Sequence, residues 1–189
     1  MVYTEEGDLL RITEAELLQF GLYKGMDLPA ELVETLAASA KKSERRSYAA
    51  RLVSGRMLSQ KEVRDKLMRH SADADEAAET SQWLTEIGAV DDAAYAGVIV
   101  RHYAAMGYGR GKIEQEFFRR GIAKDLWENA LSELPDPVDS IRRFIRGKLR
   151  DKPLDPVMSK KLSASLLRRG FQWKDIRPVL NELGQEIEE

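Results

Sequence analysis

The chain carries the same short pattern three times: an apolar helix signature, then two basic or polar residues, then a helix stop. The three stretches are Val63–Ser71, Ile113–Gly121 and Leu162–Gly170. They start 50 and then 49 positions apart, and none of them contains a gap. A fixed period of this size is typical of a supersecondary unit that is copied along a chain. Such repeats stack into broad contact surfaces for large partners and seldom enclose a reaction centre.

Helix signals divide the chain after Ser43 into nine helices, three in each repeat. Capping residues, prolines in a first turn and glycine stops set their bounds. The sequence therefore predicts an all-α fold in which three tandem three-helix repeats form an elongated curved array. In the first repeat, helices are expected at about 44–54, at 59–70 and from Asp73 or Asp75 to 87. In the second, they are expected at about 91–105, up to 120 and from Asp125 to 134. In the third, they are expected to begin at Asp136, Asp155 and Asp175.

Equivalent positions of the three repeats carry equivalent apolar residues, which predicts one core for each repeat. We expect the middle helices to bury three rows of residues, and the third helices two more. The rows of the middle helices are Val63, Ile113 and Leu162; Leu67, Phe117 and Leu166; and Met68, Phe118 and Leu167. Those of the third helices are Leu84, Leu131 and Leu180, and Ile87, Leu134 and Leu183.

The first 42 residues differ from the rest and predict a small α+β extension. Two short strands flank a turn at 5–8, and Thr13 opens a capping box with Glu16. Pro29 is expected as the first residue of a second helix that ends near Ser39. The predicted domains are therefore the extension at 1–42 and the repeats at 43–90, 91–135 and 136–189.

Charge alternates along the chain although the formal net charge is only −2. Residues 41–70 have a local net charge of +7, residues 71–100 one of −7, and residues 142–170 one of +8. One interpretation is that solvated helices pair their complementary ends with their neighbours. The other is a basic and an acidic stripe, the first facing a nucleic acid or an acidic protein. The alternation favours a binding protein and leaves the ligand open.

Basic residues are the candidates for contact with a polyanion or an acidic protein groove. Three of them recur at one position of the repeat, at a helix C-terminus, where the helix dipole also stabilises a cation. Two further clusters are denser than helix ends require. The candidate contact residues are Arg45, Arg46, Arg51, Arg56, Lys61, Arg64, Lys66, Arg110, Lys112, Arg119, Arg120, Arg142, Arg143, Arg146, Lys148, Arg150, Arg168 and Arg169.

Residues that could carry chemistry favour structural roles. His70 and His102 have no ligand set around them, and the absence of cysteine excludes disulfides and thiolate metal sites. The glycine-rich stretch 107–112 lacks the strand and the Lys-Ser/Thr of a phosphate loop, so it is expected to form a turn. The alternative is an exposed corner whose Arg110 and Lys112 touch a phosphate or a carboxylate. We expect no catalytic residues, no metal and no cofactor.

The tryptophans and the overall hydropathy of the chain give two further expectations. The three tryptophans, Trp83, Trp127 and Trp173, are expected in the cores, with stacking on bases as the alternative. No export signal opens the chain, and no apolar run approaches 18 residues. A soluble, cytoplasmic and monomeric protein that avoids membranes is expected.

Three stretches, in order and with matching spacing, resemble the repeats of the bacterial RecX regulatory proteins. The central repeat of that family is similar to three features of this chain: residues 91–96, the glycines at 107 and 109, and the Arg-Arg-Gly-Ile stretch that ends at 122. The closing stretch 166–173 is similar to the last repeat, and 59–67 is similar to the first. The resemblance covers about 43–183, and 20–26 is similar to an amino-terminal extension found in many members.

The resemblance implies a non-enzymatic regulator of the RecA recombinase. RecX proteins bind RecA filaments on DNA and typically suppress ATP hydrolysis and strand exchange, which would place this chain in DNA repair and the SOS response. The implied partners are the RecA filament and, as a second contact, the backbone of single- or double-stranded DNA. Several relatives are basic, whereas this chain has a net charge of −2. The alternative is a stand-alone nucleic-acid-binding helical repeat protein.

Overall fold

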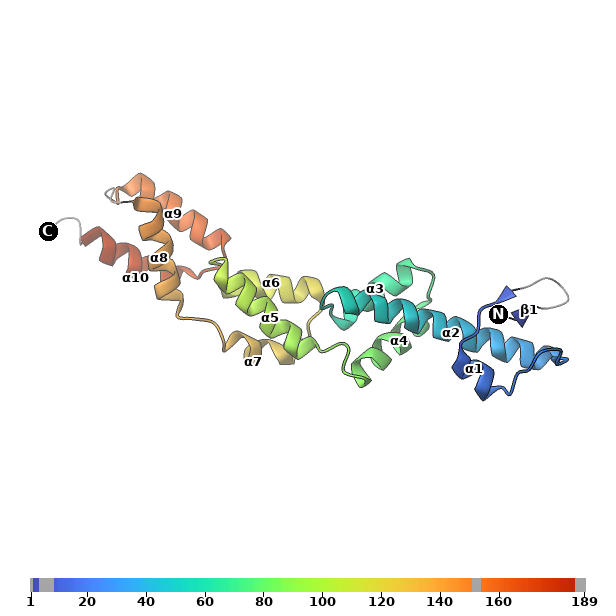
Figure 1. Ribbon diagram of the computed structural model, residues 1–189. Helices are drawn as coiled ribbons and strands as arrows, with labels where there is room; N and C mark the ends of the chain where they lie inside the picture. Colours follow the sequence, from blue (N-terminus) through green and yellow to red (C-terminus); the bar gives the residue numbers. More distant parts are fainter. Residues whose placement is uncertain (1, 4–8, 151–153, 186–189) are drawn as a thin grey trace. The chain divides into compact units, whose positions relative to one another are not determined.

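The computed structural model describes residues 2–3, 9–150 and 154–185 of the 189. Within these ranges it has ten α-helices, one 3₁₀ helix and two strands of two residues each (Figure 1). The chain divides into two compact units, Met1–Val90 and Asp91–Glu189. The predicted all-α fold of three-helix repeats is confirmed, whereas the domain bounds and the curvature of the array stay predictions.

The extension is held together by a hydrogen-bonded carboxylate. Strands β1 (Val2–Tyr3) and β2 (Leu9–Leu10) pair antiparallel, and the predicted turn at 5–8 lies outside the described residues. Helix α1 (Glu14–Gln19) starts at Thr13 with the predicted capping box. The Glu16 carboxylate is 2% exposed and also accepts hydrogen bonds from two serine hydroxyls of helix α2, Ser39 at 3.0 Å and Ser43 at 2.7 Å. These bonds fix α1 on α2.

Helix α2 (Ala30–Gly55) is one continuous helix of 26 residues. The prediction of two helices, ending near Ser39 and starting near Glu44, is wrong. The residues between them are Ala, Lys and Ser without a glycine or proline, so nothing there interrupts the backbone hydrogen bonds. Pro29 is the N-cap of α2 and not its first helical residue. The extension and the first repeat thus share a helix.

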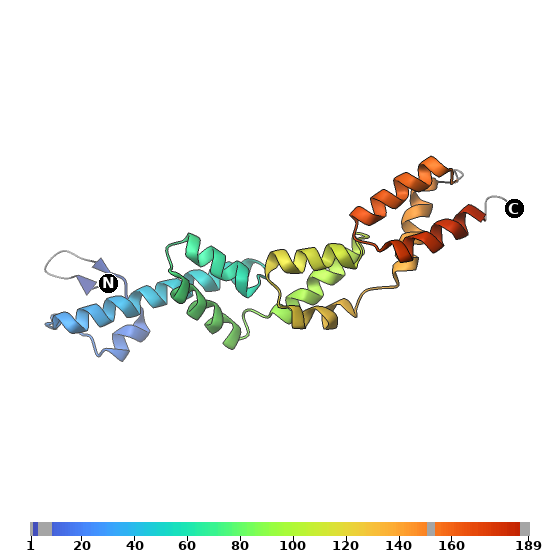
Figure 2. The ribbon, with the colours of Figure 1, turned by 180° about the vertical axis from the view of Figure 1, so that it is seen from behind.

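The first repeat consists of the end of α2 with helices α3 (Gln60–Arg69) and α4 (Ala74–Glu86). Ser59 and Asp73 both form the capping boxes that open these helices. The three helices pack on one another around a core that includes Leu67 and Leu84. Figure 2 shows the triplet from behind.

The second repeat contains helices α5 (Asp92–Ala105), α6 (Arg110–Arg120), the 3₁₀ helix η1 (Lys124–Leu126) and helix α7 (Trp127–Leu131). Asp91 caps α5 as predicted. Asp125 does not cap the last helix, because it lies inside η1, whose N-cap is Ala123. The last helix is therefore shorter than expected. Its core includes Ile113, Phe117 and Leu131.

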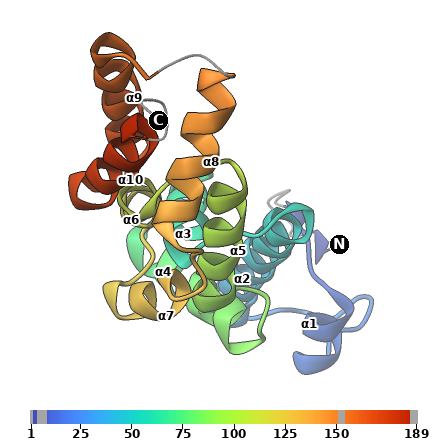
Figure 3. The same cartoon turned by 90° about the vertical axis from the view of Figure 1, so that its left-hand side faces the viewer.

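The third repeat contains helices α8 (Pro137–Leu149), α9 (Pro156–Arg168) and α10 (Trp173–Gln185). The Asp-Pro pairs open α8 and α9 as predicted, and α10 packs against both helices (Figure 3). The expected cap of α10 at Asp175 is wrong. The Gln172 carbonyl oxygen accepts the first helical hydrogen bonds, from the amides of Asp175 and Ile176, so Pro178 lies inside α10.

The three cores confirm most of the predicted rows and correct two. Val63, Ile113 and Leu162 are buried, and so are Leu67, Phe117 and Leu166 and the third-helix row of Leu84, Leu131 and Leu180. The row expected to widen the buried face is exposed instead: Met68 by 45%, Phe118 by 76% and Leu167 by 49%. Ile87 is also exposed. Adjacent helical residues point about 100° apart, and each repeat buries only a narrow stripe of its middle helix.

Candidate contact surfaces

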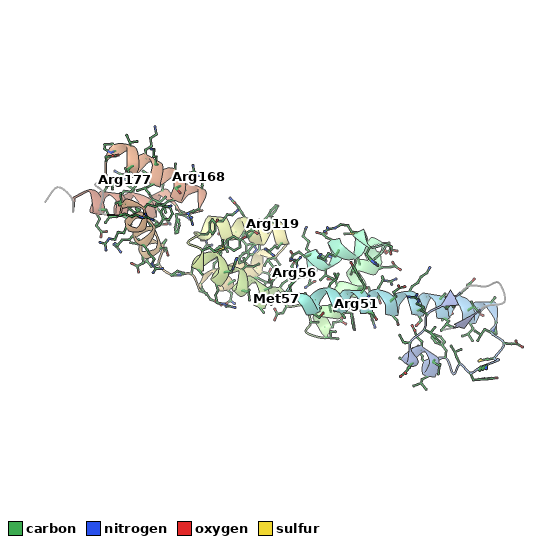
Figure 4. All side chains as sticks on the ribbon, turned by 45° about the horizontal axis from the view of Figure 1, so that its top comes forward. Arg51, Arg56, Met57, Arg119, Arg168 and Arg177 are labelled. Carbon is green, nitrogen blue, oxygen red and sulfur yellow. The ribbon has the colours of Figure 1, made fainter. Side chains whose placement is uncertain are left out.

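The four candidate arginines on α2 and at its C-cap divide into two that the first repeat holds and two without an ion pair among the described residues. The Nη1 atom of Arg45 lies 2.6 Å from the Glu76 carboxylate, and the Arg46 guanidinium lies 4.8 Å from the centre of the Trp83 ring. Arg51 and Arg56 are exposed and form no ion pair with any residue that the structure describes. Exposed Met57 follows Arg56, and Figure 4 labels these three side chains. We name Arg51, Arg56 and Met57 the α2-end surface.

Helix α3 contributes fewer free cations than its sequence indicates. Lys61 pairs with Asp65 at 2.8 Å, and the Nε atom of Arg69 donates to the Asp65 carbonyl oxygen at 3.0 Å. Lys66 is half-buried, so Arg64 is the most open of the predicted residues on this helix.

The buried carboxylate of Glu116 organises the cations of α6. Its Oε2 atom accepts from Arg119 at 3.0 Å and lies 3.6 Å from the Nε of Arg120, and its Oε1 atom lies 3.7 Å from Lys112. Burial acts to raise the pKa of Glu116, but the hydrogen bond and charge of Arg119, with the charge of Arg120, outweigh it and lower the pKa. Lys112, Arg119 and Arg120 thus surround one ionised carboxylate.

Arg110 is held in the same way. Its Nε donates to Glu114 at 2.7 Å, and its Nη2 atom donates to Glu128. The hydrogen bond to Glu128, followed by that to Glu114, raises the pKa of Arg110. Arg110, which the alternative interpretation assigned to an external phosphate or carboxylate, thus contacts two carboxylates of the protein itself.

The 107–112 turn packs backbone against backbone on the turn between α9 and α10. The Gly109 amide donates to the Arg169 carbonyl oxygen at 2.8 Å, and the Gly111 amide donates to the Gly170 carbonyl oxygen at 3.0 Å. A Cβ atom on Gly170 would lie 2.2 Å from the Lys112 nitrogen. The glycines form the expected turn between two helices, and they also allow this close approach, which was not predicted.

Arg169 belongs to the same junction and not to a free surface. Its Nη1 atom donates to the carbonyl oxygens of Met106 and Gly107, both at 3.1 Å. Its guanidinium lies 5.1 Å from the Tyr108 ring centre and 4.8 Å from that of Phe144. The preceding Arg168 is exposed and has no ion pair in the described part of the chain.

The third repeat carries a further group of exposed cations. Arg142 is held by Asp139 and Glu182, at 3.1 and 3.0 Å. We name the exposed remainder the repeat-3 cations; sequence reasoning missed four of them, Lys160, Lys161, Lys174 and Arg177. The members are Arg143, Arg146, Lys148, Arg150, Lys160, Lys161, Arg168, Lys174 and Arg177. Figure 4 labels Arg168 and Arg177. The sequence signal that could have found them is the net charge of +9 that residues 142–177 carry.

Tryptophan and histidine positions do not form a reaction centre. Trp127 packs against Phe117 and donates its Nε1–H to the Ile122 carbonyl oxygen at 2.9 Å, whereas Trp173 is 50% exposed, against expectation. His70 stacks on Tyr48, with ring centres 3.9 Å apart. No group of three metal-ligating side chains is found among the described residues.

Among the cavities lined by described residues, one lies in each unit. One of about 780 Å³, between the second and third repeats, is lined by residues that include Tyr108, Leu134 and Phe171. The other, of about 330 Å³, includes Tyr48 and His70 in the first unit. Neither brings together a nucleophile, a base and an oxyanion site. No described helix combines the length and the apolarity that a bilayer crossing requires.

Three similar helix triplets, each with a small core of its own, define the class: this is a helical-repeat protein. The family model for the second three-helix domain of RecX matches residues 91–131. The chain is 30% identical over 200 residues to the regulatory protein RecX of Lactobacillus delbrueckii subsp. bulgaricus, covering 100% of this chain and 71% of that protein. Identity to the RecX of Oceanobacillus iheyensis is 27%, covering 91% and 65%. The chain belongs to the RecX family of regulatory proteins.

Solved structures agree with this assignment at the level of the fold. A crystal structure of a regulatory protein RecX superposes with a TM-score of 0.79 and 20% identity over 95% of this chain and 92% of that one. RecX from Lactobacillus salivarius superposes with a TM-score of 0.69 and 23% identity, over 77% of this chain and 97% of its own. The resemblance drawn from the three sequence stretches is thereby confirmed.

Proposed function

We propose that this chain is a non-enzymatic regulator that binds RecA filaments on DNA and lowers their ATP hydrolysis and strand exchange. Its membership of a family of regulatory proteins supports this role. The observation that carries it is the set of exposed arginines without acidic partners among the described residues, Arg51, Arg56, Arg168 and Arg177, on modules with complete cores of their own. Such a surface suits an extended, negatively charged assembly.

The test is the DNA-stimulated ATPase activity of RecA, measured with substoichiometric amounts of this protein. A regulator that acts on the filament lowers the rate when it is far scarcer than RecA. An unchanged rate at every ratio, with filaments confirmed by electron microscopy, would remove the proposal. The full chain is used, in the cytoplasmic salt range, because charge contacts weaken as ionic strength rises.

The second candidate is a stand-alone nucleic-acid-binding protein whose effect on recombination is indirect. The net charge of +9 over residues 142–177 favours it. Affinity for naked single-stranded DNA, measured by fluorescence anisotropy over a range of salt, separates the two candidates. Equal affinity for naked DNA and for filaments supports the second candidate; a clear preference for filaments supports the first.

A further inference from the structure

Each repeat ends its middle helix with an exposed apolar residue followed by an arginine. We name these the apolar–arginine pairs: Met68–Arg69, Phe118–Arg119 and Leu167–Arg168. The apolar members are 45%, 76% and 49% exposed, whereas the residues directly before them, Leu67, Phe117 and Leu166, are 2% exposed or less. The exposed position therefore recurs in all three repeats and is not a local accident of one of them.

The cores of the repeats leave these apolar residues uncovered. Each core contains the preceding buried residue and excludes the apolar member of the pair. An isolated exposed apolar residue needs no explanation, but an apolar residue exposed at the same position of every repeat marks a contact position. The Phe118 side chain is largely exposed to solvent. Its burial against a partner would stabilise a complex.

The arginines of the pairs are exposed, so a partner can reach their guanidinium groups. The Arg119 side chain is 65% exposed while it holds Glu116. Arg168 forms no ion pair within the described ranges, and Arg69 uses its Nε on the carbonyl oxygen of Asp65. A guanidinium carries five N–H donors in a planar fork that suits a carboxylate.

Resting on the proposed function, we infer that the apolar–arginine pairs contact the protein subunits of the filament and not its DNA. Each pair fits an apolar depression beside a carboxylate. The apolar members are Met, Phe and Leu, so what they share is size and apolarity; stacking on bases would require a ring in each repeat. A phosphate contact would require the arginine alone.

The geometry of the second unit suits a partner made of identical subunits. Helix α9 ends at the junction where α6 begins, because the Gly111 amide bonds to the Gly170 carbonyl oxygen, and Figures 1 and 2 show α6 running on from that point. Phe118 lies seven residues after Gly111, a rise of about 10 Å along α6 at 1.5 Å per residue, so the pairs of α9 and α6 are separated by a distance on the order of 10 Å along this helix. A polymer can offer the same depression to both.

The test replaces Phe118→Ser and Leu167→Ser together in the full chain. Since both side chains are exposed, the variant should keep its helicity and melting temperature. We expect its affinity for RecA filaments, measured by co-sedimentation, to fall at least about tenfold, and its affinity for naked single-stranded DNA to stay within about twofold. The matched control is Val157→Ser, which removes a 63% exposed apolar side chain from α9 without an adjacent arginine.

A second variant separates lost contact from lost structure. Phe118→Met with Leu167→Met keeps both positions apolar and should retain filament binding within about threefold, even if the serine variant proves poorly folded. An equal loss on naked DNA would assign the pairs to nucleic acid. Unchanged filament binding by a folded serine variant would overturn the inference alone, whereas a wild-type chain that ignores filaments would overturn the proposed function with it.

Discussion

The C-terminal end of α2 and the whole of α6 both carry arginines, yet these arginines differ in their contacts. In α6, Glu114 and Glu116 stand three or four residues from Arg110, Arg119 and Arg120 and hold all of them. Arg51 and Arg56 have only Ser, Tyr, Leu, Val, Gly and Gln at those spacings. Residues three and four apart are neighbours on a helix, so the position of the acids decides which arginines are held by ion pairs within their own helix.

Helix α6 begins at the junction between the 107–112 turn and the turn between α9 and α10. Breaking this junction should have the largest effect on stability. Gly170→Ala puts a Cβ atom 2.2 Å from the Lys112 nitrogen, at a backbone φ of +85°. The left-handed conformation and the forced shift of backbone together should cost about 3 kcal/mol. Scanning calorimetry of the full chain should show this as a lower melting temperature.

Gly147→Ala is the control for that experiment. Gly147 lies within α8, and a Cβ atom there meets nothing within 4 Å. Because alanine is the better helix former, this variant should gain about 1 kcal/mol. If both glycine variants melted alike, the junction would not be a tight one and the cations of α6 would have another support.

Glu116→Gln should cause the next largest loss of stability, because it removes the charge that Lys112, Arg119 and Arg120 surround. The variant loses charged hydrogen bonds in a nearly buried place, which should lower the free energy of unfolding by about 2 kcal/mol at pH 7. The pKa of Glu116 is lowered in the folded state, so its stabilisation is present above the ordinary carboxyl pKa and is lost as the pH falls through the folded value.

Denaturant unfolding between pH 7 and pH 3 measures this contribution. The difference in stability between the wild type and the glutamine variant should shrink as the pH falls. The comparison with the variant is needed because Glu16 and Glu79, whose pKa values are also lowered, act in the same direction. A difference that stays constant with pH would mean that the Glu116 charge contributes nothing to folding.

The distinction between held and free arginines also predicts binding. Arg51→Gln with Arg56→Gln should weaken filament binding about tenfold, equal to about 1.4 kcal/mol, and leave the melting temperature unchanged because neither residue has an ion pair to lose. Arg101→Gln with Arg110→Gln is the matched pair, since Arg101 holds Glu133 at 2.7 Å and Arg110 holds Glu114. Co-sedimentation with RecA filaments compares the two variants.

The second pair of substitutions should affect stability and spare binding. The reverse result, in which loss of the held arginines abolished binding and loss of the free ones did not, would contradict the division made from the ion pairs. The exposed ion pairs themselves are each worth less than about 1 kcal/mol, so a small loss of stability suffices.

Local signals in the sequence predicted the parts of this structure that local hydrogen bonds determine. Thr13, Ser59, Asp73 and Asp91 all cap helices as expected, because a cap needs only its own next three residues. The held arginines of α6 could also have been predicted from the spacing of its glutamates. The buried rows followed from apolar periodicity in three aligned copies.

Contacts between residues far apart in the sequence could not be predicted from local signals. Arg169 has the same sequence context as Arg120, yet it binds carbonyl oxygens more than sixty positions away. The exposure of Phe118 depends on how narrow a stripe the neighbouring helices cover, and composition does not give that width. The site residues divide into held and free only once these contacts are known.

The smallest expected effect separates the first repeat from the others at the turn after the middle helix. Gly121 and Gly170 occupy this turn at φ of +70° and +85°, whereas the first repeat has Ser71 there at φ of +105°. Since a side chain disfavours this conformation, Ser71→Gly should stabilise the chain by about 0.5–1 kcal/mol, and the reverse change Gly121→Ser should cost about 1 kcal/mol. Chemical denaturation of both variants measures the two values.

Neither Ser71 nor Gly121 belongs to the α2-end surface or to an apolar–arginine pair, so filament binding should not change in either variant. If Ser71→Gly stabilised the chain but weakened filament binding, the strained backbone at Ser71 would serve binding. The repeats would then differ in this strain as well as in which arginines are held by ion pairs.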